Sequence, residues 1–588
     1  MKGGEFLVTV TDYKTVFIPE EWNEEQLMIR DTCQDFLDKE VFSQLDRIDT
    51  LEDGLMAKLV ENAGALGLLG ASVPEELGGM GLDFMTSMLT TEILGSGNSF
   101  AVAFSAHTGI GTLPILYYGT EEQRKKYVPK LASGEWKASY CLTEPDSGSD
   151  ANAAKSTAKL SDDGKHYIIN GQKMWITNAG FADVFIVFAR IEDDKYLTAF
   201  IVEKGTEGIS LNPEEKKLGI KGSSTRQVFF NNCTIPVENM LAGRGEGFKI
   251  AVNILNIGRI KLAIAAVGSS KKLSTISVKY ANERNQFGRP ISKYGAIRYK
   301  LSEQVTRIFA CESALYRLSK DIENTILELE KTGLDSHEAK LKGAEEFAIE
   351  AAMMKVHGSE VLDYVVDEGL QIFGGMGYSA EAPMERSYRD ARINRIFEGT
   401  NEINRLLTVD MTLRRAMKGK INLMGPAQDV VKELTSIPDF SDSYDEPLSY
   451  ETSMVENFKK AILLVAGAAV KKFEFSLAKE QEVLMNIADM MIETYVSEST
   501  ILRVKKLMDI KGAEHSAVYI DIARLYTNNA CDIIDKKARE AANIIAEGDE
   551  LRMLLLGIKR FTKQNQFNSK IARHHIAEKL IESNSYCY

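Results

Sequence analysis

The stretch YIINGQKMWITN (167–178) decides the fold, because it is short, β-branched and aromatic in a chain whose flanks have helical patterns. Three similar segments follow it: DVFIVFARI (183–191), YLTAFIVEK (196–204) and QVFFNNCTIP (227–236). Turn sequences such as DDGK and EDDK separate them. Short segments of this composition with turns between them are typical of β-strands. We therefore predict a small β domain over residues 139–246.

Helical patterns lie on both sides of this domain. EEQLMIRDTCQDFLDKEV (24–41) and EAKLKGAEEFAIEAAMMKVHGSEVLDYVVDEGLQIF (338–373) place apolar residues at helical spacing. The polar stretch TSIPDFSDSYDEPLSYET (435–452) is typical of a linker. The predicted fold is mainly α with an inserted β domain. In chain order we predict an N-terminal helical domain (1–138), the middle β domain (139–246), a helical-bundle domain (247–415), a linker (416–452) and a C-terminal helical domain (453–588).

Composition describes a soluble protein of several domains. The chain has 588 residues, 44% of them hydrophobic and 26% charged, with a net charge of −13. This acidic balance argues against a nucleic-acid partner. The opening residues lack the pattern of a secretory signal, the six cysteines form no CxxC, and the seven histidines show no metal-binding spacing. We expect reduced thiols, no metal and a cytoplasmic location.

The segment RIFEGTNEINR (395–405) carries an unusually placed carboxylate. Glu398 follows the apolar pair Ile396-Phe397 and precedes Gly399. Apolar surroundings disfavour the charged form of a carboxyl group and so raise its pKa. A base with a raised pKa suits the deprotonation of a weak carbon acid. The alternative is an ordinary helix start with Glu in the first turn, and the two interpretations are compatible.

Four other motifs each have two interpretations. YCLTEPDSGSDANAAKS (140–156) is a β-turn or a set of N–H groups and hydroxyls that face a ligand. GQKMWITNAG (171–180) packs its Trp in the core or presents it as a flat wall to a planar ring. ERNQFGRPISKYGAIR (283–298) is a solvated loop or a phosphate site, and QIFGGMGYS (371–379) is a helix end or a diphosphate cradle. Taken singly, each motif is weak evidence for binding.

Together and in this order, these motifs and LGIKGSSTR (218–226) resemble the acyl-CoA dehydrogenase family. The resemblance covers residues 25 to about 415, and the helical, β, helical order is similar to the family's architecture. The C-terminal region resembles the extension of the very-long-chain branch. The resemblance implies an FAD-dependent oxidoreductase that forms a trans-2-enoyl-CoA from a saturated acyl-CoA in fatty-acid β-oxidation.

The resemblance also implies the residues that hold FAD. Contacts with the isoalloxazine or pyrophosphate would come from Tyr140, Leu142, Thr143 and Ser149. The ring would be flanked by Trp175, Ile176 and Thr177, with the Thr177 hydroxyl near flavin N5. The FAD of a neighbouring subunit would be reached by Arg284, Phe287, Gln371, Gly374 and Gly375. The adenine-side phosphates would be bound by Thr400 and Glu402, although many relatives have Gln or Ser where this chain has Asn401 and Glu402.

By the same resemblance, Glu398 is the catalytic base, and a β-hydrogen leaves as hydride to the flavin. Gly399 lets the backbone approach the substrate carbonyl, and an N–H donated by Glu398 would acidify the α-proton. One branch of the family places its base immediately before an arginine, but this chain has Gly258 before Arg259, so Glu398 stands alone. The implied substrate-binding residues are Ser149, Asn256, Arg259, Gly399, Ala101 and Ser105.

The acyl pocket should be floored by GSGNSFAVAFSAHTG (95–109). Ala101 and Ser105 stand where medium-chain relatives have larger polar residues. Smaller side chains leave a deeper apolar slot, and each buried CH₂ is worth roughly 0.8 kcal/mol. We therefore expect long acyl chains. The alternative is that other residues fill the slot.

The expected partners are an acyl-CoA substrate and electron-transfer flavoprotein. The C-terminal region would cover a surface that tetrameric relatives use, which leaves a homodimer. The basic amphipathic stretch TLRRAMKGKINLM (412–424) is either a peripheral membrane contact or a helix packed on its own protein. Two rival functions remain: an acyl-CoA oxidase, which passes electrons to oxygen, and a non-catalytic flavin-binding scaffold. A nitroalkane oxidase would have Asp in place of Glu398.

Overall fold

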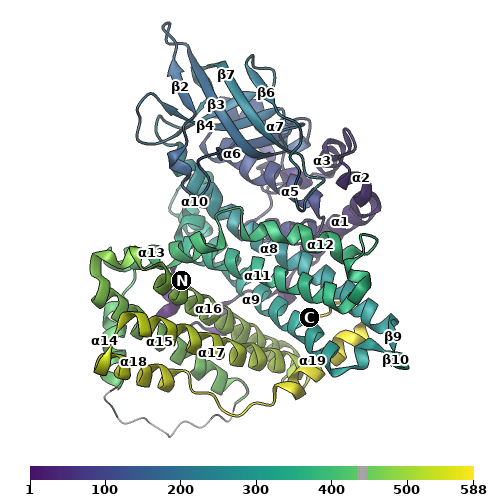
Figure 1. Ribbon diagram of the computed structural model, residues 1–588. Helices are drawn as coiled ribbons and strands as arrows, with labels where there is room; N and C mark the ends of the chain where they lie inside the picture. Colours follow the sequence, from purple (N-terminus) through teal and green to yellow (C-terminus); the bar gives the residue numbers. More distant parts are fainter. Residues whose placement is uncertain (435, 437–443, 445) are drawn as a thin grey trace.

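The computed structural model describes residues 1–434, 436, 444 and 446–588 (Figure 1). Seven helices form the N-terminal helical domain within residues 24–133. Their bounds are α1 (Glu24–Phe36), α2 (Leu45–Asp49), α3 (Leu55–Ala65), α4 (Phe84–Leu94), α5 (Ser99–Ser105), α6 (Leu113–Tyr118) and α7 (Glu121–Ser133). Capping boxes begin α1 at Asn23 and α7 at Thr120, so local sequence fixes both starts.

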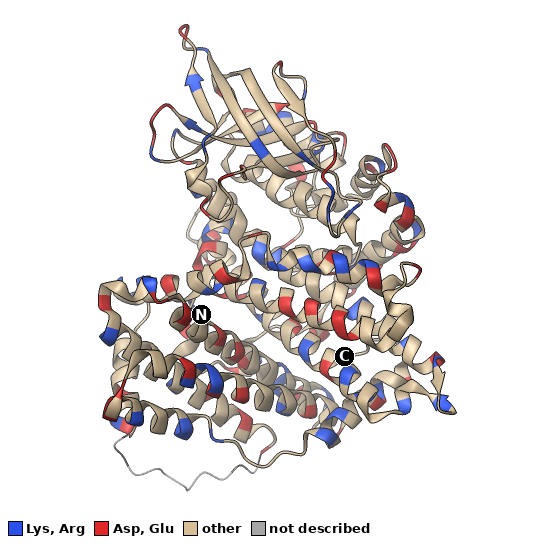
Figure 2. Ribbon diagram, in the orientation of Figure 1, with Lys and Arg blue, Asp and Glu red and all other residues tan. Residues whose placement is uncertain are grey.

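The β domain is one sheet with the order β6-β7-β3-β2-β4-β5-β8, and β1 pairs with β4. Its strands are β1 (Ala138–Cys141), β2 (Thr157–Leu160), β3 (His166–Thr177), β4 (Val184–Ile191), β5 (Thr198–Glu203), β6 (Ile209–Leu211), β7 (Thr225–Pro236) and β8 (Met240–Leu241). The pairs β1–β4 and β2–β4 are parallel and the others antiparallel. Figure 2 shows that the strands are largely uncharged.

Strand β4 is apolar along almost its whole length because both of its faces are buried. Val184, Ile186 and Phe188 pack into a core shared with helices α6 and α7. Their neighbours Phe185 and Val187 pack into a separate core that lies within the β domain. Because successive side chains of a strand point to opposite faces, β4 is buried on both faces. This double burial attaches the β domain to the N-terminal helices.

The helical-bundle domain follows. Its elements are α8 (Gly247–Glu283), the hairpin strands β9 (Asn285–Gln286) and β10 (Arg289–Pro290), α9 (Gly295–Lys331), α10 (Ser336–Glu346), α11 (Ala348–Phe373), α12 (Pro383–Ala391) and α13 (Asn401–Met417). Helices α8, α9 and α11 pack against one another and share one core with the C-terminal helices. Figure 1 shows this bundle between the β domain and the C-terminal helices.

The C-terminal helices are α14 (Met424–Leu434), α15 (Ser449–Phe473), α16 (Gln481–Lys511), α17 (Ala517–Ile545), α18 (Gly548–Phe561) and α19 (Ser569–Ser583). Helix α14 lies inside the segment 416–452 that we predicted as a linker, and it packs against α15. That part of the prediction is therefore corrected. Residues 435, 437–443 and 445 of the predicted linker lie outside the described residues.

The first 22 residues, which we assigned to the N-terminal helical domain, make contacts with the C-terminal helices. Lys459 donates a hydrogen bond to the Thr9 carbonyl at 2.8 Å, and Lys506 donates one to the Val16 carbonyl at 2.7 Å. The side chain of Phe6 is buried against Tyr495 with ring centroids 5.0 Å apart. This opening segment therefore packs on α15 and α16.

Buried ion pairs join α9 to α16. Arg503 is 2% exposed and pairs with Glu312 at 2.8 Å and with Glu20 at 2.7 Å. Arg317 pairs with Glu498 at 2.8 Å. Because an unpaired buried charge is costly, these pairs fix how the C-terminal helices sit on the bundle.

Two stretches, Ser99–Tyr118 and Gly247–Glu283, are long and apolar enough to cross a membrane by length and composition. However, 78% and 67% of their most apolar windows are buried inside the protein. Core helices of soluble proteins show the same combination, so these stretches are weak evidence for a membrane span.

Candidate active site

A cavity of about 1740 Å³ lies where the β domain meets the bundle. It is lined by Tyr140, Leu142, Thr143, Ser149, Trp175, Ile176, Thr177, Asn256, Arg259, Glu398, Gly399 and Thr400. A smaller cavity of about 170 Å³ adjoins it and is lined by Ala101 and Ser105. Thr177 and Glu398 line both. The structure thus brings most of the predicted site residues together.

Glu398 and Gly399 form a left-handed pair at the junction of the two cavities. Their φ angles are +58° and +82°. A non-glycine residue rarely adopts this conformation, which costs on the order of 1–2 kcal/mol. The segment turns here because α13 starts immediately afterwards, with the Thr400 side chain accepting a hydrogen bond from the Ile403 N–H at 3.3 Å. The helix-start interpretation is confirmed, and Glu398 lies just outside that helix.

The Glu398 carboxylate is poorly stabilised as an anion. Its Oε2 is buried and has no hydrogen-bond partner among the residues that the structure describes. Burial raises the pKa of Glu398 to about 7, although the positive charges of Arg259 and Lys355 oppose the rise. A carboxyl group with this pKa is suited to take and hold a proton near neutral pH.

Three side chains hold the backbone on which Glu398 sits. Lys355 donates from Nζ to the Gly399 carbonyl at 2.7 Å. Asn404 donates from Nδ2 to the same carbonyl at 2.8 Å, and Arg259 approaches the Glu398 carbonyl at 3.4 Å. These contacts restrain a strained loop. Lys355 and Asn404 were not predicted from the sequence, although a lone lysine in the apolar stretch AAMMKVHG (351–358) is a detectable signal.

Gly258 faces the carboxylate directly. A Cβ atom at this position would lie 2.8 Å from Glu398 Oε2 and 3.1 Å from its Cδ. Such a separation is below van der Waals contact, so any side chain at 258 would have to displace the carboxylate. Glycine at this position therefore leaves room for the carboxyl group that Glu398 supplies.

The β-domain wall of the large cavity has a flat aromatic surface. A register shift between Lys173 and Ile176 interrupts the pairing of β3 with β7, and Trp175 has a φ of +60°. Trp175 is 51% exposed, so the core interpretation of this residue is wrong. A bulge re-aims a side chain in this way. The wall is suited to a planar ring.

A buried ion pair between the turn EPDSGSD and strand β3 holds the turn in place. This pair was not predicted from the sequence. Lys173, fully buried, contacts Glu144 Oε1 at 2.6 Å. Glu144 also accepts hydrogen bonds from the Lys155 and Ser156 N–H groups. The turn between Glu144 and Ser147 is a tight one, as expected, and it also lines the cavity through Ser149.

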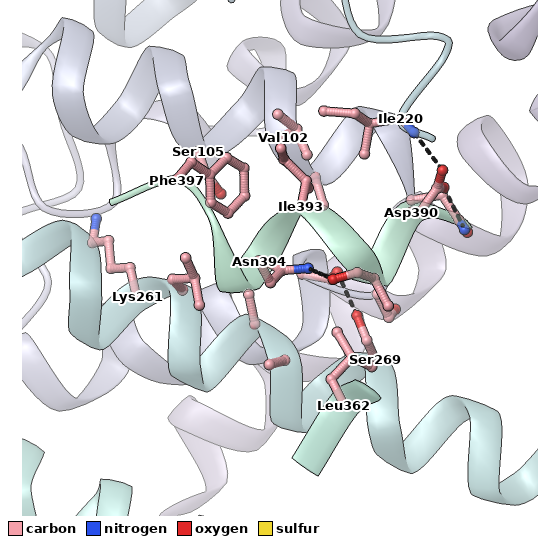
Figure 3. Close-up of a pocket in the computed structure, with 18 of the residues that line it drawn as sticks. Val102, Ser105, Ile220, Lys261, Ser269, Leu362, Asp390, Ile393, Asn394 and Phe397 are labelled. Carbon is pink, nitrogen blue, oxygen red and sulfur yellow. Dashed lines mark hydrogen bonds between the residues drawn. The ribbon is translucent and has the colours of Figure 1, made fainter. Parts of the chain in front are cut away.

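The smaller cavity is a largely apolar slot. Figure 3 shows Val102 and Ser105 of α5 together with Ile393 and Phe397 from the segment before Glu398. Small residues of α8, among them Ala265, line the opposite side. Glu398 lines both the slot and the large cavity, so a chain that spanned the two cavities would lie beside the carboxylate.

Six predicted residues do not line these cavities. Arg284, Phe287, Gln371, Gly374 and Gly375 lie at the adjoining ends of α8 and α11, and Glu402 lies exposed in the first turn of α13. Tyr280 stacks on Phe373 with centroids 3.9 Å apart, which brings those two helix ends together. Gly374, with a φ of +59°, follows the end of α11. Their proposed contact with another subunit stays a prediction.

Similarity to known proteins covers the whole chain. A probable acyl-CoA dehydrogenase of Bacillus subtilis is 43% identical over 589 residues, which is 100% of this chain and 98% of the relative. The chain belongs to the acyl-CoA dehydrogenase family. Its segments match the descriptions "Acyl-CoA dehydrogenase, N-terminal domain" (23–135), "middle domain" (139–233) and, twice, "C-terminal domain" (245–412 and 457–560).

Two further matches extend this conclusion. The crystal structure of an acyl-CoA dehydrogenase complexed with FAD from Bacillus anthracis has a TM-score of 0.97, 45% identity and full coverage of both chains. A very long-chain specific acyl-CoA dehydrogenase of Rattus norvegicus is 36% identical over 81% of this chain and 74% of the relative. The predicted family, fold class and oxidoreductase class are confirmed, and the second C-terminal match falls in the predicted extension.

Proposed function

We propose that this acyl-CoA dehydrogenase uses FAD to convert long-chain saturated acyl-CoA to trans-2-enoyl-CoA in fatty-acid β-oxidation, with electron-transfer flavoprotein as acceptor. The observation that carries the proposal is the position of Glu398. Its carboxylate, with a pKa raised to about 7, stands between an apolar slot and a wall formed by Trp175 and Thr177. A thioester whose acyl chain occupies the slot would present its α-carbon to this base.

The residues of the large cavity fit FAD. The Tyr140 hydroxyl is buried without a hydrogen-bond partner in the described part of the chain, and it borders the cavity. Buried polar groups are normally satisfied, so this hydroxyl is suited to a ligand. Trp175 supplies a flat surface, and the residues near Ser149 supply polar groups. When bound, FAD would supply the hydride acceptor that the protein itself lacks.

The chain's own groups would perform the proton chemistry. No acceptor for the Glu398 N–H is present among the described residues, so this group is available to a thioester carbonyl. A hydrogen bond to that oxygen stabilises the negative charge that develops as the α-proton leaves. The Glu398 carboxylate would take that proton. The apolar side chains of Phe397 and Ile393 would line the bound acyl chain.

A homodimer is part of the proposal. Phe287 is 94% exposed at the tip of the β9–β10 hairpin, and Tyr378 is 87% exposed just beyond α11. Large aromatic side chains in contact with solvent favour a protein partner. A second copy that covers this end of the bundle would bring Arg284 and Phe287 to the FAD of its neighbour.

The test is an anaerobic titration of the FAD-loaded protein with butanoyl-, octanoyl-, palmitoyl- and isovaleryl-CoA. Best bleaching of the flavin band with palmitoyl-CoA supports the proposal. Best bleaching with a shorter thioester keeps the enzyme class and refutes the long-chain assignment. Reduced flavin that is discharged by electron-transfer flavoprotein but persists in air excludes the oxidase.

Two further outcomes bear on the base. Glu398→Gln should retain FAD and bind acyl-CoA, but should not bleach. Bleaching at the wild-type rate in this variant refutes the assignment of the base. A wild-type protein that holds FAD and bleaches with no thioester favours the non-catalytic scaffold.

A further inference from the structure

Lys355 is a buried lysine that contacts the loop of the catalytic base. Its side chain is 0% exposed on α11, within a largely apolar stretch. Burying an ammonium group is costly unless the group is paired or hydrogen-bonded. Nζ donates to the Gly399 carbonyl at 2.7 Å and to Asn401 Oδ1 at 2.9 Å. Both acceptors are neutral, so these bonds restrain the loop without neutralising the charge.

The charge of Lys355 acts on Glu398. The cationic groups that face the carboxylate are Arg259 from α8 and Lys355 from α11, and both lower the pKa of Glu398. Tyr140 faces it from β1, but burial and Glu398 itself raise the pKa of this phenol, which keeps it neutral. An arginine stays charged at any working pH, whereas the pKa of a lysine shifts readily when its ammonium group is buried.

Burial lowers the pKa of Lys355 to about 7. Of the charged groups around it, Glu398 acts most strongly on Lys355, followed by Arg259, Glu402 and Glu360. Two groups that interact and titrate in the same range lose and gain protons as a pair. The charge of Lys355 and the charge of the base are therefore linked.

We propose that Lys355 is a positioning residue for the base: its ammonium group holds the Gly399 carbonyl and favours the ionised form of the Glu398 carboxylate. This role rests on the proposed function, in which Glu398 is the base. If Lys355 has this role, removal of its charge should shift the pH at which Glu398 loses its proton. A purely structural role predicts no such shift.

Asn404 provides a matched control on the same loop. Its Nδ2 donates to the Gly399 carbonyl at 2.8 Å and to the Thr400 carbonyl at 3.1 Å. Asn404→Ala therefore removes backbone restraints of the same kind as those of Lys355 but removes no charge. Comparison of the two variants separates the charge from the restraint.

The first measurement needs no substrate. Infrared difference spectra of the FAD-loaded protein, with the Glu398→Gln spectrum subtracted, report the protonation of Glu398 from about pH 5 to about pH 9. In Lys355→Met the midpoint should rise by about one pH unit, because an opposite charge favours the ionised form. Lys355→Arg keeps a positive charge and should not raise the midpoint, and Asn404→Ala should stay close to wild type. If Lys355→Met fails to hold FAD, Lys355→Gln, which also lacks the charge, decides in its place.

The second measurement is the rate of flavin bleaching against pH. In Lys355→Met the acid limb of the pH–rate profile should move to higher pH by about one pH unit. In Asn404→Ala the rate should fall by the same factor at every pH, without a shift of the profile. An unchanged infrared midpoint in a folded, FAD-loaded variant without the charge overturns the role of Lys355. If none of the acyl-CoA substrates bleaches the flavin of the wild-type protein, the proposed function is refuted. The infrared titration still decides the role of Lys355 in that case.

Discussion

Ionisation of Glu398 should make the folded protein less stable at neutral and higher pH. The pKa of this carboxyl rises from 4.5 to about 7 on folding. Between these values the unfolded chain has released a proton that the folded chain keeps, so stability falls as pH rises through this window. Above about pH 7 the loss is constant. Below about pH 4.5 it vanishes.

The size of this effect follows from linkage. A rise of about 2.5 in pKa corresponds to about 3 kcal/mol at pH 8, and to about 1 kcal/mol at pH 5, where the unfolded carboxyl is largely ionised. Both figures are upper limits, because Glu398 borders a cavity that admits water. Glu398→Gln removes the ionisation and should stabilise the protein by up to these amounts. If the chain unfolds as one unit, about 3 kcal/mol raises Tm by roughly 2–3 °C.

The assay is thermal unfolding of FAD-loaded wild type and Glu398→Gln at about pH 5 and about pH 8. The Tm advantage of the variant should be larger at the higher pH. Glu402→Gln is the control, because Glu402 lies exposed on the same segment and its pKa is lowered, chiefly by a backbone hydrogen bond. That control should show no stabilisation at either pH. A Tm advantage of Glu398→Gln that is equal at both pH values, or absent at pH 8, would show that ionisation of Glu398 does not lower stability.

Three further outcomes are expected. Gly258→Ala places a Cβ 2.8 Å from Glu398 Oε2, so the rate of flavin bleaching should fall about 100-fold while FAD content is unchanged. Ala101→Leu narrows the acyl slot and should reduce bleaching by palmitoyl-CoA about tenfold relative to butanoyl-CoA. Arg503→Ala removes a buried cation that pairs with Glu312 and Glu20, and it should cost about 2 kcal/mol or more in denaturant titrations although Glu312 keeps its pair with Lys271. The exposed Arg552→Ala should change stability by less than about 0.5 kcal/mol.

Local patterns predicted those features that local forces decide. The continuous apolar run of β4 follows from burial on both of its faces, and the start of α13 follows from the Thr400 cap. The apolar residues before Glu398 correctly indicated a carboxyl with a raised pKa. Each of these features leaves a signal within a few residues of the sequence.

Features that depend on distant contacts were missed. The opening segment packs on helices more than 400 residues away, as the bond from Lys459 to Thr9 shows. The contact of Lys355 with Gly399 joins residues 44 positions apart, and no periodicity marks it. Trp175 leaves the core because of a bulge, which the pattern of β3 does not indicate. Helix α14 was missed because its polar surroundings resemble a linker.

Several energetically costly groups of this fold border the large cavity. Trp175, Ile220 and Glu398 border it with positive φ angles, and the Tyr140 hydroxyl and Glu398 Oε2 face it without partners in the described part of the chain. Binding groups held in costly conformations need a rigid frame, which here comes from the cores of the β domain and the bundle. A ligand that supplies the missing partners removes part of these costs, so its binding free energy also becomes folding stability. The residues that prepare the site for acyl-CoA and FAD therefore make the stability of the protein depend on the binding of these ligands.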